Sequence, residues 1–453
     1  MSNMLYRKIE SAVYQRLSSA TDKVLVVSGA RQVGKSYIIR YVGKKLFKNY
    51  IEINLIEDYE GDKLFSAVKT IEDFYLILSA VSGNKLGNAS DTLVFLDEIQ
   101  QYPNLLTLLK FLRQDGRYRY VASGSLLGVT LRKSTSIPMG SIEILNMYPL
   151  DFEEFLIANN FGSEAIDAVR RCFENRESLP EAMHNRVMDL FKRYLLVGGM
   201  PEAVVAYLDT HNIVKVRQIQ NDIHNLYGLD AAKYDTEHTL RIKRIYDMIP
   251  SNMENTKKRL FFNRVEEGKS RRSADYLEEI DYLASSGVVQ EVKAISNPVF
   301  PLIESCRKNL LKLYLNDVGL LTAVLYRTNI LPVLEDECGV NLGSVYECVV
   351  ACELASKNLA LFYYDNKANG EVDFIIDDYQ TLSVLPIEVK SGKDYKRHIA
   401  ISRMVSNPDY SVRNGIVLSN SRQVEVIDKI IYMPVYMVMF VGELNIDAEN
   451  LMF

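Results

Sequence analysis

The sequence has no apolar run long enough for a membrane-spanning helix. Its longest such stretch, residues 430–441, is shorter than the roughly 20 residues that cross a bilayer, and it contains Pro434. Residues 1–10 are polar and charged, so we expect no secretory signal peptide there. We therefore expect a cytoplasmic protein that does not bind membranes.

The chain has no excess of basic residues either. Its 53 lysines and arginines are set against 58 aspartates and glutamates, which gives a net charge of −5. Such a chain has no overall attraction to nucleic acid, so any binding of this kind must come from a local basic patch.

Cysteine pairs of the C-x-x-C type are absent. The five cysteines are Cys172, Cys306, Cys338, Cys348 and Cys352. The last two lie one helical turn apart, but no histidine lies near them in the sequence. This pattern favours buried, reduced thiols over a metal site.

The sequence does contain one complete phosphate-binding motif, Gly29-Ala30-Arg31-Gln32-Val33-Gly34-Lys35-Ser36, which fits the pattern G-x-x-x-x-G-K-[ST]. An apolar run at 24–27 precedes it and predicts a buried strand, and residues 37–42 can open a helix. In a strand–loop–helix, successive backbone N–H groups face an anion. We therefore predict a nucleotide site, in which Lys35 neutralises the β- and γ-phosphates and Ser36 helps to hold Mg²⁺.

Two carboxylates follow a later apolar segment, residues 92–98. We predict that Asp97 holds Mg²⁺ through water and that Glu98 orients or deprotonates the attacking water. Ser123 ends the next strand, where it could bond the γ-phosphate or the water. The alternatives are an exposed acidic pair and a turn-forming serine. Arg119 and Arg132 are both candidates for an arginine that stabilises charge on the γ-phosphate, and the sequence does not choose between them.

The pattern along the chain predicts an α/β protein of several domains, since 453 residues exceed one compact core. Residues 1–150 alternate helices with five strands, a pattern typical of a parallel sheet with ligands at the carboxyl ends of its strands. Residues 151–250 are helical and predict a lid or connector. In 251–305, helix, turn, helix and strand follow one another as in a winged helix. Residues 306–453 suggest a second α/β domain. The five strands are expected at 24–27, 50–54, 92–98, 119–123 and 142–145.

The order of the motifs resembles a prokaryotic family of AAA+-type ATPases that carry a C-terminal domain of unknown function. The resemblance implies ATP binding and hydrolysis, a winged-helix-like middle, and a C-terminal fold like that of PD-(D/E)xK restriction endonucleases. Many relatives have Gly-Arg before the Tyr-Pro-Leu segment, whereas this chain reads Gly140-Ser141. The stretches that carry the resemblance are Gly29–Ser36, Leu96–Gln100, Ser123–Ser125, Tyr148–Phe155, Gly198–Glu202 and Leu313–Leu320.

A second group of chemically active residues lies in the C-terminal part. The segments 371–376 and 385–390 predict neighbouring strands, in which Glu388 and Lys390 share a face and Asp373 lies beside them. Glu347 falls in a predicted helix, residues 344–357. The set resembles the D…E-x-K site of nucleases, in which carboxylates bind Mg²⁺ and the lysine positions the nucleophile. The alternative is a salt-bridged face on a half-exposed sheet.

A basic patch lies within residues 257–272, where a winged helix would meet phosphates. The patch could bind DNA or RNA; alternatively it is a solvated face, or it pairs with acidic groups of the same chain. The preferred hypothesis is an ATPase that controls a nucleic-acid-binding or nuclease-like domain, and a homo-oligomer is compatible with it. The alternative is an ATP-dependent switch or scaffold for proteins, with an inactive nuclease fold. The basic residues are Lys257, Lys258, Arg259, Arg264, Lys269, Arg271 and Arg272.

Overall fold

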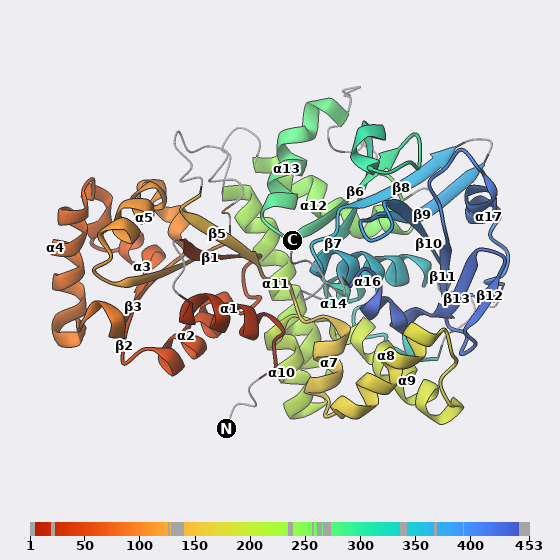
Figure 1. Cartoon of the computed structure of the whole chain (residues 1–453), viewed down its shortest axis with the longest axis horizontal. Coiled ribbons are helices and arrows are strands. Elements are labelled where there is room, and N and C mark those ends of the chain that lie inside the picture. Colours follow the sequence, from red (N-terminus) through yellow and green to blue (C-terminus); the bar gives the residue numbers. More distant parts are fainter. Residues whose placement is uncertain are drawn as a thin grey trace, which may run out of the picture. The chain divides into compact units, whose positions relative to one another are not determined.

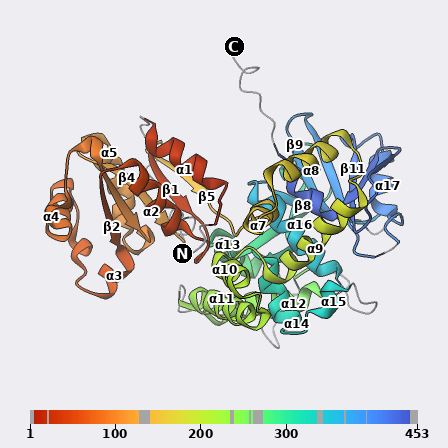
Figure 2. The same ribbon diagram turned by 90° about the horizontal axis from the view of Figure 1, so that it is seen from below.

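In the computed structural model the chain forms two compact units (Figures 1 and 2). One unit comprises Met4–Tyr148 and Ser285–Val288, and the other comprises Met1–Asn3, Pro149–Ala284 and Val289–Phe453. The structure describes residues 5–19, 23–125, 127, 140–233, 239–255, 258–260, 265, 273–335, 342–366, 369–392 and 394–443.

The first unit is built on a five-stranded parallel sheet in the order β2-β3-β4-β1-β5. All five strands predicted from the sequence are present, so the predicted parallel α/β sheet is confirmed. The strands are β1 (Val24–Ser28), β2 (Asn49–Asn54), β3 (Thr92–Asp97), β4 (Arg119–Gly124) and β5 (Ile142–Asn146). The helices are α1 (Ile9–Ser18), α2 (Lys35–Leu46), α3 (Leu55–Glu60), α4 (Ile71–Ser82) and α5 (Pro103–Asp115).

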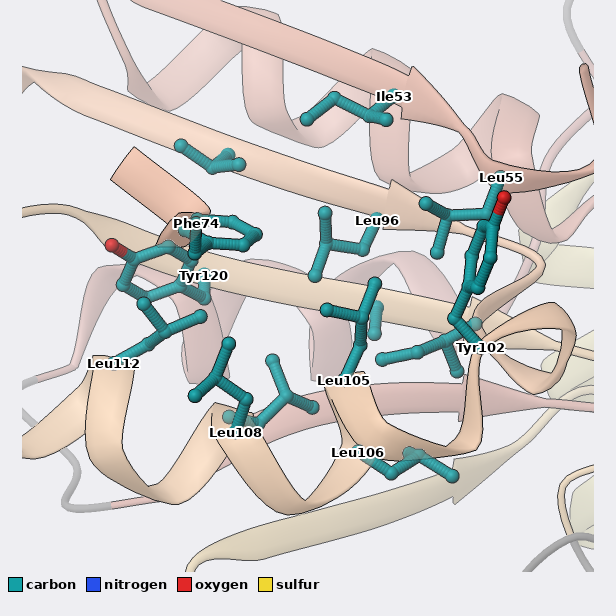
Figure 3. Packing of buried hydrophobic residues seen from close by; sticks show 14 of the residues in the cluster. Ile53, Leu55, Phe74, Leu96, Tyr102, Leu105, Leu106, Leu108, Leu112 and Tyr120 are labelled. Atoms are coloured by element: carbon teal, nitrogen blue, oxygen red, sulfur yellow. The ribbon is translucent and has the colours of Figure 1, made fainter. Parts of the chain in front are cut away.

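Strand β3 shows why this sheet needs helices on both faces, because every one of its residues is buried. Leu93 points toward Gly43 of α2, while Leu96 belongs to the core on the opposite face. Figure 3 shows that core, in which Leu105 and Leu112 of α5 point toward the strands. Burial of such side chains contributes about 1.5–3 kcal/mol each. The packing fixes β3, and with it the position of the polar residues at its carboxyl end.

The second unit begins with helices. An N-terminal capping box at Asp151 starts α7, and the chain turns at Gly198–Pro201 between α9 and α10. Pro250 lies inside α12. The helices are α7 (Phe152–Ala158), α8 (Ser163–Asn175), α9 (Glu181–Val197), α10 (Pro201–Thr210), α11 (Ile213–Lys233), α12 (Thr239–Met253), α13 (Leu277–Ser285), α14 (Val318–Tyr326) and α15 (Leu331–Leu334).

An eight-stranded mixed sheet follows in the same unit, in the order β12-β13-β11-β10-β9-β8-β6-β7. Strand β6 lies between β7 and β8. The sequence pattern suggested separate domains at 251–305 and 306–453, and the hydrogen bonds of β6 to β7 and β8 join these two segments in one sheet. The strands are β6 (Val289–Ile295), β7 (Cys306–Leu315), β8 (Leu361–Asn366), β9 (Gly370–Asp378), β10 (Ser383–Val389), β11 (Gly415–Ser419), β12 (Glu425–Ile427) and β13 (Ile430–Pro434).

Helices α16 (Gly343–Ser356) and α17 (Ile399–Ser406) each contact more than one strand of this sheet, and α12 and α14 contact β7. Helix α16 is buried along most of its length, whereas α17 buries Ile401, Met404 and Val405 in an apolar core with β9, β10 and β13. Within the described part of the chain, every helix is too short or too polar to cross a membrane.

Candidate functional site

The phosphate-binding motif forms the loop between β1 and α2. Gly34 has φ +100°, in the left-handed region that favours glycine, and a side chain on Gly29 would collide with the Met147 carbonyl oxygen, 2.1 Å from the Cβ position. The buried guanidinium of Arg7 donates to the carbonyl oxygens of Val33 (2.8 Å) and Tyr148 (2.6 Å). The loop is therefore held by glycine geometry and by Arg7, whose part in it was not predicted from the sequence.

Lys35 begins helix α2 with its side chain folded into the loop. Its Nζ donates to the carbonyl oxygens of Gly29 (3.0 Å) and Ala30 (2.8 Å). Burial lowers the pKa of Lys35 from its ordinary value, and the carboxylates of Glu98 and Asp97 oppose that shift. The ammonium is thus held by the loop and lies within electrostatic range of Asp97 and Glu98.

Asp97 links three of the predicted site residues. Its Oδ2 accepts a hydrogen bond from the Ser36 hydroxyl at 2.7 Å, and its Oδ1 accepts one from the Ser123 hydroxyl. Burial raises the pKa of Asp97, while the hydrogen bonds from Ser123 and Ser36 act in the opposite direction. Hydroxyl and carboxylate oxygens are ligands that Mg²⁺ prefers, so Ser36 and Asp97 fit a magnesium ion held at the phosphates of a nucleotide.

Glu98 has an unusual backbone conformation, with φ 57° and ψ 50°. A left-handed conformation costs a non-glycine residue about 1–3 kcal/mol, and such strain clusters at functional sites. Two donors converge on its Oε2: the amide of Gln100 and the hydroxyl of Ser125, the latter at 3.1 Å. The Gln100 amide also donates to the Ser125 hydroxyl at 3.2 Å. Sequence analysis gave neither residue a role, although both lie in the stretches that carry the resemblance.

The two arginine candidates lie elsewhere. Arg119 starts β4, at the end of the strand opposite to Ser123, and its guanidinium donates to the Ser19 carbonyl oxygen at 3.1 Å. This position does not suit a contact with a nucleotide at the carboxyl ends of the strands. Arg132 lies outside the described residues.

The C-terminal candidate residues lie on adjacent elements. Strands β9 and β10 are antiparallel neighbours, and the Val389 backbone N–H donates to Asp373 Oδ2 at 2.9 Å. The Lys390 ammonium donates to Glu388 Oε1 at 2.7 Å, and Glu347 projects from α16. Burial raises the pKa of Asp373 well above its usual range, and Glu347 and Glu388 add to the shift.

Two further lysines and a tyrosine belong to the same cluster. Lys258 forms an ion pair with Glu347 Oε1, and the Tyr314 hydroxyl donates to Glu347 Oε2 at 2.9 Å. Lys312 forms an ion pair with Glu371. Burial lowers the pKa of Lys312, but Glu347 and Glu371 outweigh it, so the pKa is raised. Sequence analysis missed Lys312, Tyr314 and Glu371, and it placed Lys258 in the basic patch instead.

Only two residues of that patch can be placed. Besides Lys258, Arg259 forms an ion pair with Asp365 and lies over the Tyr363 ring, 5.9 Å from its centroid. Both cations therefore pair with carboxylates of their own unit. The other residues of the patch, Lys257, Arg264, Lys269, Arg271 and Arg272, lie outside the described residues.

Comparison with known proteins supports an ATPase domain at the N-terminal end. Residues 21–156 match the family model of an AAA domain. Residues 188–330 and 342–438 match two families described only as domains of unknown function (DUF8612 and DUF4143). An uncharacterised protein of Haemophilus influenzae is 26% identical over 190 residues, which span 41% of this chain and 41% of that protein. Residues 21–156 are thus similar to AAA domains.

Solved structures similar to this chain share little sequence with it. The Walker-type ATPase PABY2304 of Pyrococcus abyssi has a TM-score of 0.43 and 15% identity, with 71% of this chain and 96% of that chain covered. The ORC2 protein of Aeropyrum pernix has a TM-score of 0.39 and 14% identity, with 74% and 97% covered. The RuvB Holliday junction branch migration motor of Thermotoga maritima has a TM-score of 0.29 and 15% identity, with 63% and 89% covered.

Proposed function

We propose that this chain, in which residues 21–156 match an AAA domain, binds ATP with Mg²⁺ and hydrolyses it. The observation that carries the proposal is the bonding of Asp97 to both Ser36 and Ser123, next to Lys35. Three segments distant in the sequence meet there at the carboxyl ends of parallel strands, the place where open α/β sheets bind ligands. The experiment that tests the proposal is a measurement of phosphate release from ATP with and without Mg²⁺.

Each residue predicted for the nucleotide site has a role in this proposal. The N–H groups of residues 29–36 bind the phosphates at the start of α2, and Lys35 exchanges its loop carbonyls for phosphate oxygens. Ser36 and Asp97 hold the magnesium ion. Bound MgATP supplies the phosphoryl group that is transferred to water. Glu98 orients that water and accepts its proton, and Ser123 fixes Asp97.

Exchanging Glu98 for glutamine should separate binding from hydrolysis. The Glu98→Gln side chain has nearly the same shape but cannot accept a proton, so we expect kcat to fall by roughly 10²–10⁴-fold while ATP affinity stays within about twofold. Phosphate release and calorimetric ATP binding measure the two effects. Glu72→Gln, on the exposed first turn of α4, is the matched control and should keep full activity. Unchanged kcat in Glu98→Gln would remove Glu98 from the mechanism.

Ser125 should act on the same step through Glu98. Because Ser125 and Gln100 both donate to Oε2, Oε1 is the oxygen that faces the water in our proposal. We expect Ser125→Ala to lower kcat about tenfold, as for the loss of one hydrogen bond to a charged group, with KM for ATP unchanged. Ser125→Thr keeps the hydroxyl and should restore most of kcat. A rise in KM with kcat intact would instead assign Ser125 to nucleotide binding.

We further propose that the nucleotide state is coupled to the C-terminal domain. Two alternative hypotheses describe the function of that domain. In the first, this domain binds or processes nucleic acid, and residues 257–272 contribute to the contact. In the second, the protein is an ATP-dependent switch for protein partners with an inactive nuclease fold. The ion pair between Lys258 and Glu347 favours the second. Stimulation of ATP hydrolysis by DNA or RNA would favour the first.

A further inference from the structure

The carboxylate cluster of the C-terminal unit does not fit the divalent cation that a nuclease of the resembled type needs. In the part of the chain that the structure describes, no three Asp, Glu, His or Cys side chains are grouped so as to hold a metal ion. We propose that the ammonium groups of Lys258 and Lys312 stand in the place of that cation, so that the cluster is a built-in ion-pair centre. The proposal concerns this cluster alone and does not depend on the ATPase proposal.

The contacts of Glu347 show most directly that an ammonium group takes the place of a metal ion. One of its carboxylate oxygens is paired with the Lys258 ammonium and the other accepts the Tyr314 hydroxyl, at 2.9 Å. Glu347 and Tyr314 are buried, and the Lys258 side chain is 13% exposed. Each carboxylate oxygen has two lone pairs, but the Lys258 ammonium beside Oε1 would repel a metal ion at that oxygen. A divalent cation would therefore bind here only if it displaced Lys258.

Lys312 adds a second positive charge, from β7. Its side chain is 1% exposed, pairs with Glu371, and lies 4.9 Å from the centroid of the Tyr363 ring. An ammonium this deeply buried is tolerated only beside carboxylates that compensate its lost hydration. The positive charge of Lys312 therefore neutralises part of the negative charge that would otherwise attract a metal ion.

The remaining groups leave little for a metal to bind. One oxygen of Asp373 accepts the Val389 N–H, and one oxygen of Glu388 accepts Lys390. Glu388 Oε2 is buried without a hydrogen-bond partner. Three ammonium groups face four carboxylates, so with all seven groups ionised the cluster carries one negative charge in excess. The acidic members are Glu347, Glu371, Asp373 and Glu388, and the basic ones are Lys258, Lys312 and Lys390. A divalent cation would overcompensate that charge.

The test uses Mn²⁺ as the probe and the nucleotide-free full chain. Free Mn²⁺ is followed by electron paramagnetic resonance, whose signal is lost on binding. We expect the wild type and Glu388→Gln to bind Mn²⁺ identically, because in our proposal the cluster of the wild type binds no metal ion. We expect Lys258→Met to gain a Mn²⁺ site, because Glu347 Oε1 is freed and the cluster becomes more negative. The double variant Lys258→Met/Glu388→Gln should lose that site again.

Lys396→Met is the matched control, because Lys396 pairs with Glu425 at 2.7 Å on the surface and should gain no Mn²⁺ site. Weaker Mn²⁺ binding in Glu388→Gln than in the wild type would overturn the proposal, and so would a folded Lys258→Met that gains no site. If Lys258→Met does not fold, the comparison of Mn²⁺ binding between the wild type and Glu388→Gln still tests the proposal. Plasmid cleavage with Mg²⁺ or Mn²⁺ that disappears in Lys390→Ala would also overturn it. ATP hydrolysis by the same preparations is recorded separately, so failure of one proposal is not mistaken for failure of the other.

Discussion

Replacing Lys35 by alanine is expected to abolish ATP hydrolysis, with kcat/KM reduced by at least about a thousandfold. The Lys35 ammonium is held by the carbonyl oxygens of the phosphate-binding loop and lies within electrostatic range of Asp97 and Glu98. In the transition state it would face the charge that develops on the phosphoryl oxygens, and no other lysine lies in residues 24–43. Steady-state phosphate release measures the loss, and calorimetry measures the accompanying loss of ATP affinity.

The Lys35→Ala variant should nevertheless stay folded. Burial lowers the pKa of Lys35, which means that the folded protein gains little from holding this charge in its loop. We therefore expect the thermal midpoint to change little, so that lost activity cannot be ascribed to unfolding. Lys44→Ala, at an exposed position on the same helix, is the matched control and should hydrolyse ATP like the wild type. Full activity in Lys35→Ala would disprove the ATP site proposed here.

The N-terminal sheet could be predicted because its signals are local. An apolar run followed by a glycine loop and a helix start defines β1 and α2, and the polar Asp97 ends the apolar run of β3. Parallel pairing then brings the ends of such strands to one edge. The role of Ser125 beside Glu98 could not be predicted this way. It depends on the left-handed backbone at Glu98, which no residue type in that stretch signals.

The C-terminal cluster was harder to predict because its partners are distant in the sequence. The spacing of Asp373, Glu388 and Lys390 was enough to place two adjacent strands. Lys258, however, lies 89 residues from Glu347, and a local pattern of basic residues cannot show that one of them is an internal counter-ion. The position of strand β6 was also hard to predict, because its pairing partners are distant in the sequence. The order helix, turn, helix, strand in residues 251–305 is the same for the wing of a winged helix and for a strand such as β6, which is paired on both edges within a larger sheet.

Replacing Gly199 by alanine is expected to cause a large loss of stability in the second unit. A Cβ at Gly199 would lie 2.0 Å from the Leu150 carbonyl oxygen and 2.7 Å from its nitrogen. These backbone atoms cannot move freely, because the Leu150 N–H donates to the Gly199 carbonyl oxygen at 2.7 Å. The buried Asp317 carboxylate fixes the turn from the other side by accepting the N–H groups of Gly199 and Leu320. The turn between α9 and α10 therefore has no room for a methyl group.

We expect Gly199→Ala to cost about 3 kcal/mol or more, because relief of the clash must break the Leu150 bond or the Asp317 bonds. The thermal midpoint of this unit should fall by roughly 6 °C or more, measured by calorimetry. Gly162→Ala is the matched control: Gly162 has φ −63° before α8, and a Cβ there meets nothing within 4 Å. It should cost less than about 1 kcal/mol. Equal midpoints for the two variants would show that Leu150 can move away from residue 199, and that the turn is not the rigid joint that its hydrogen bonds imply.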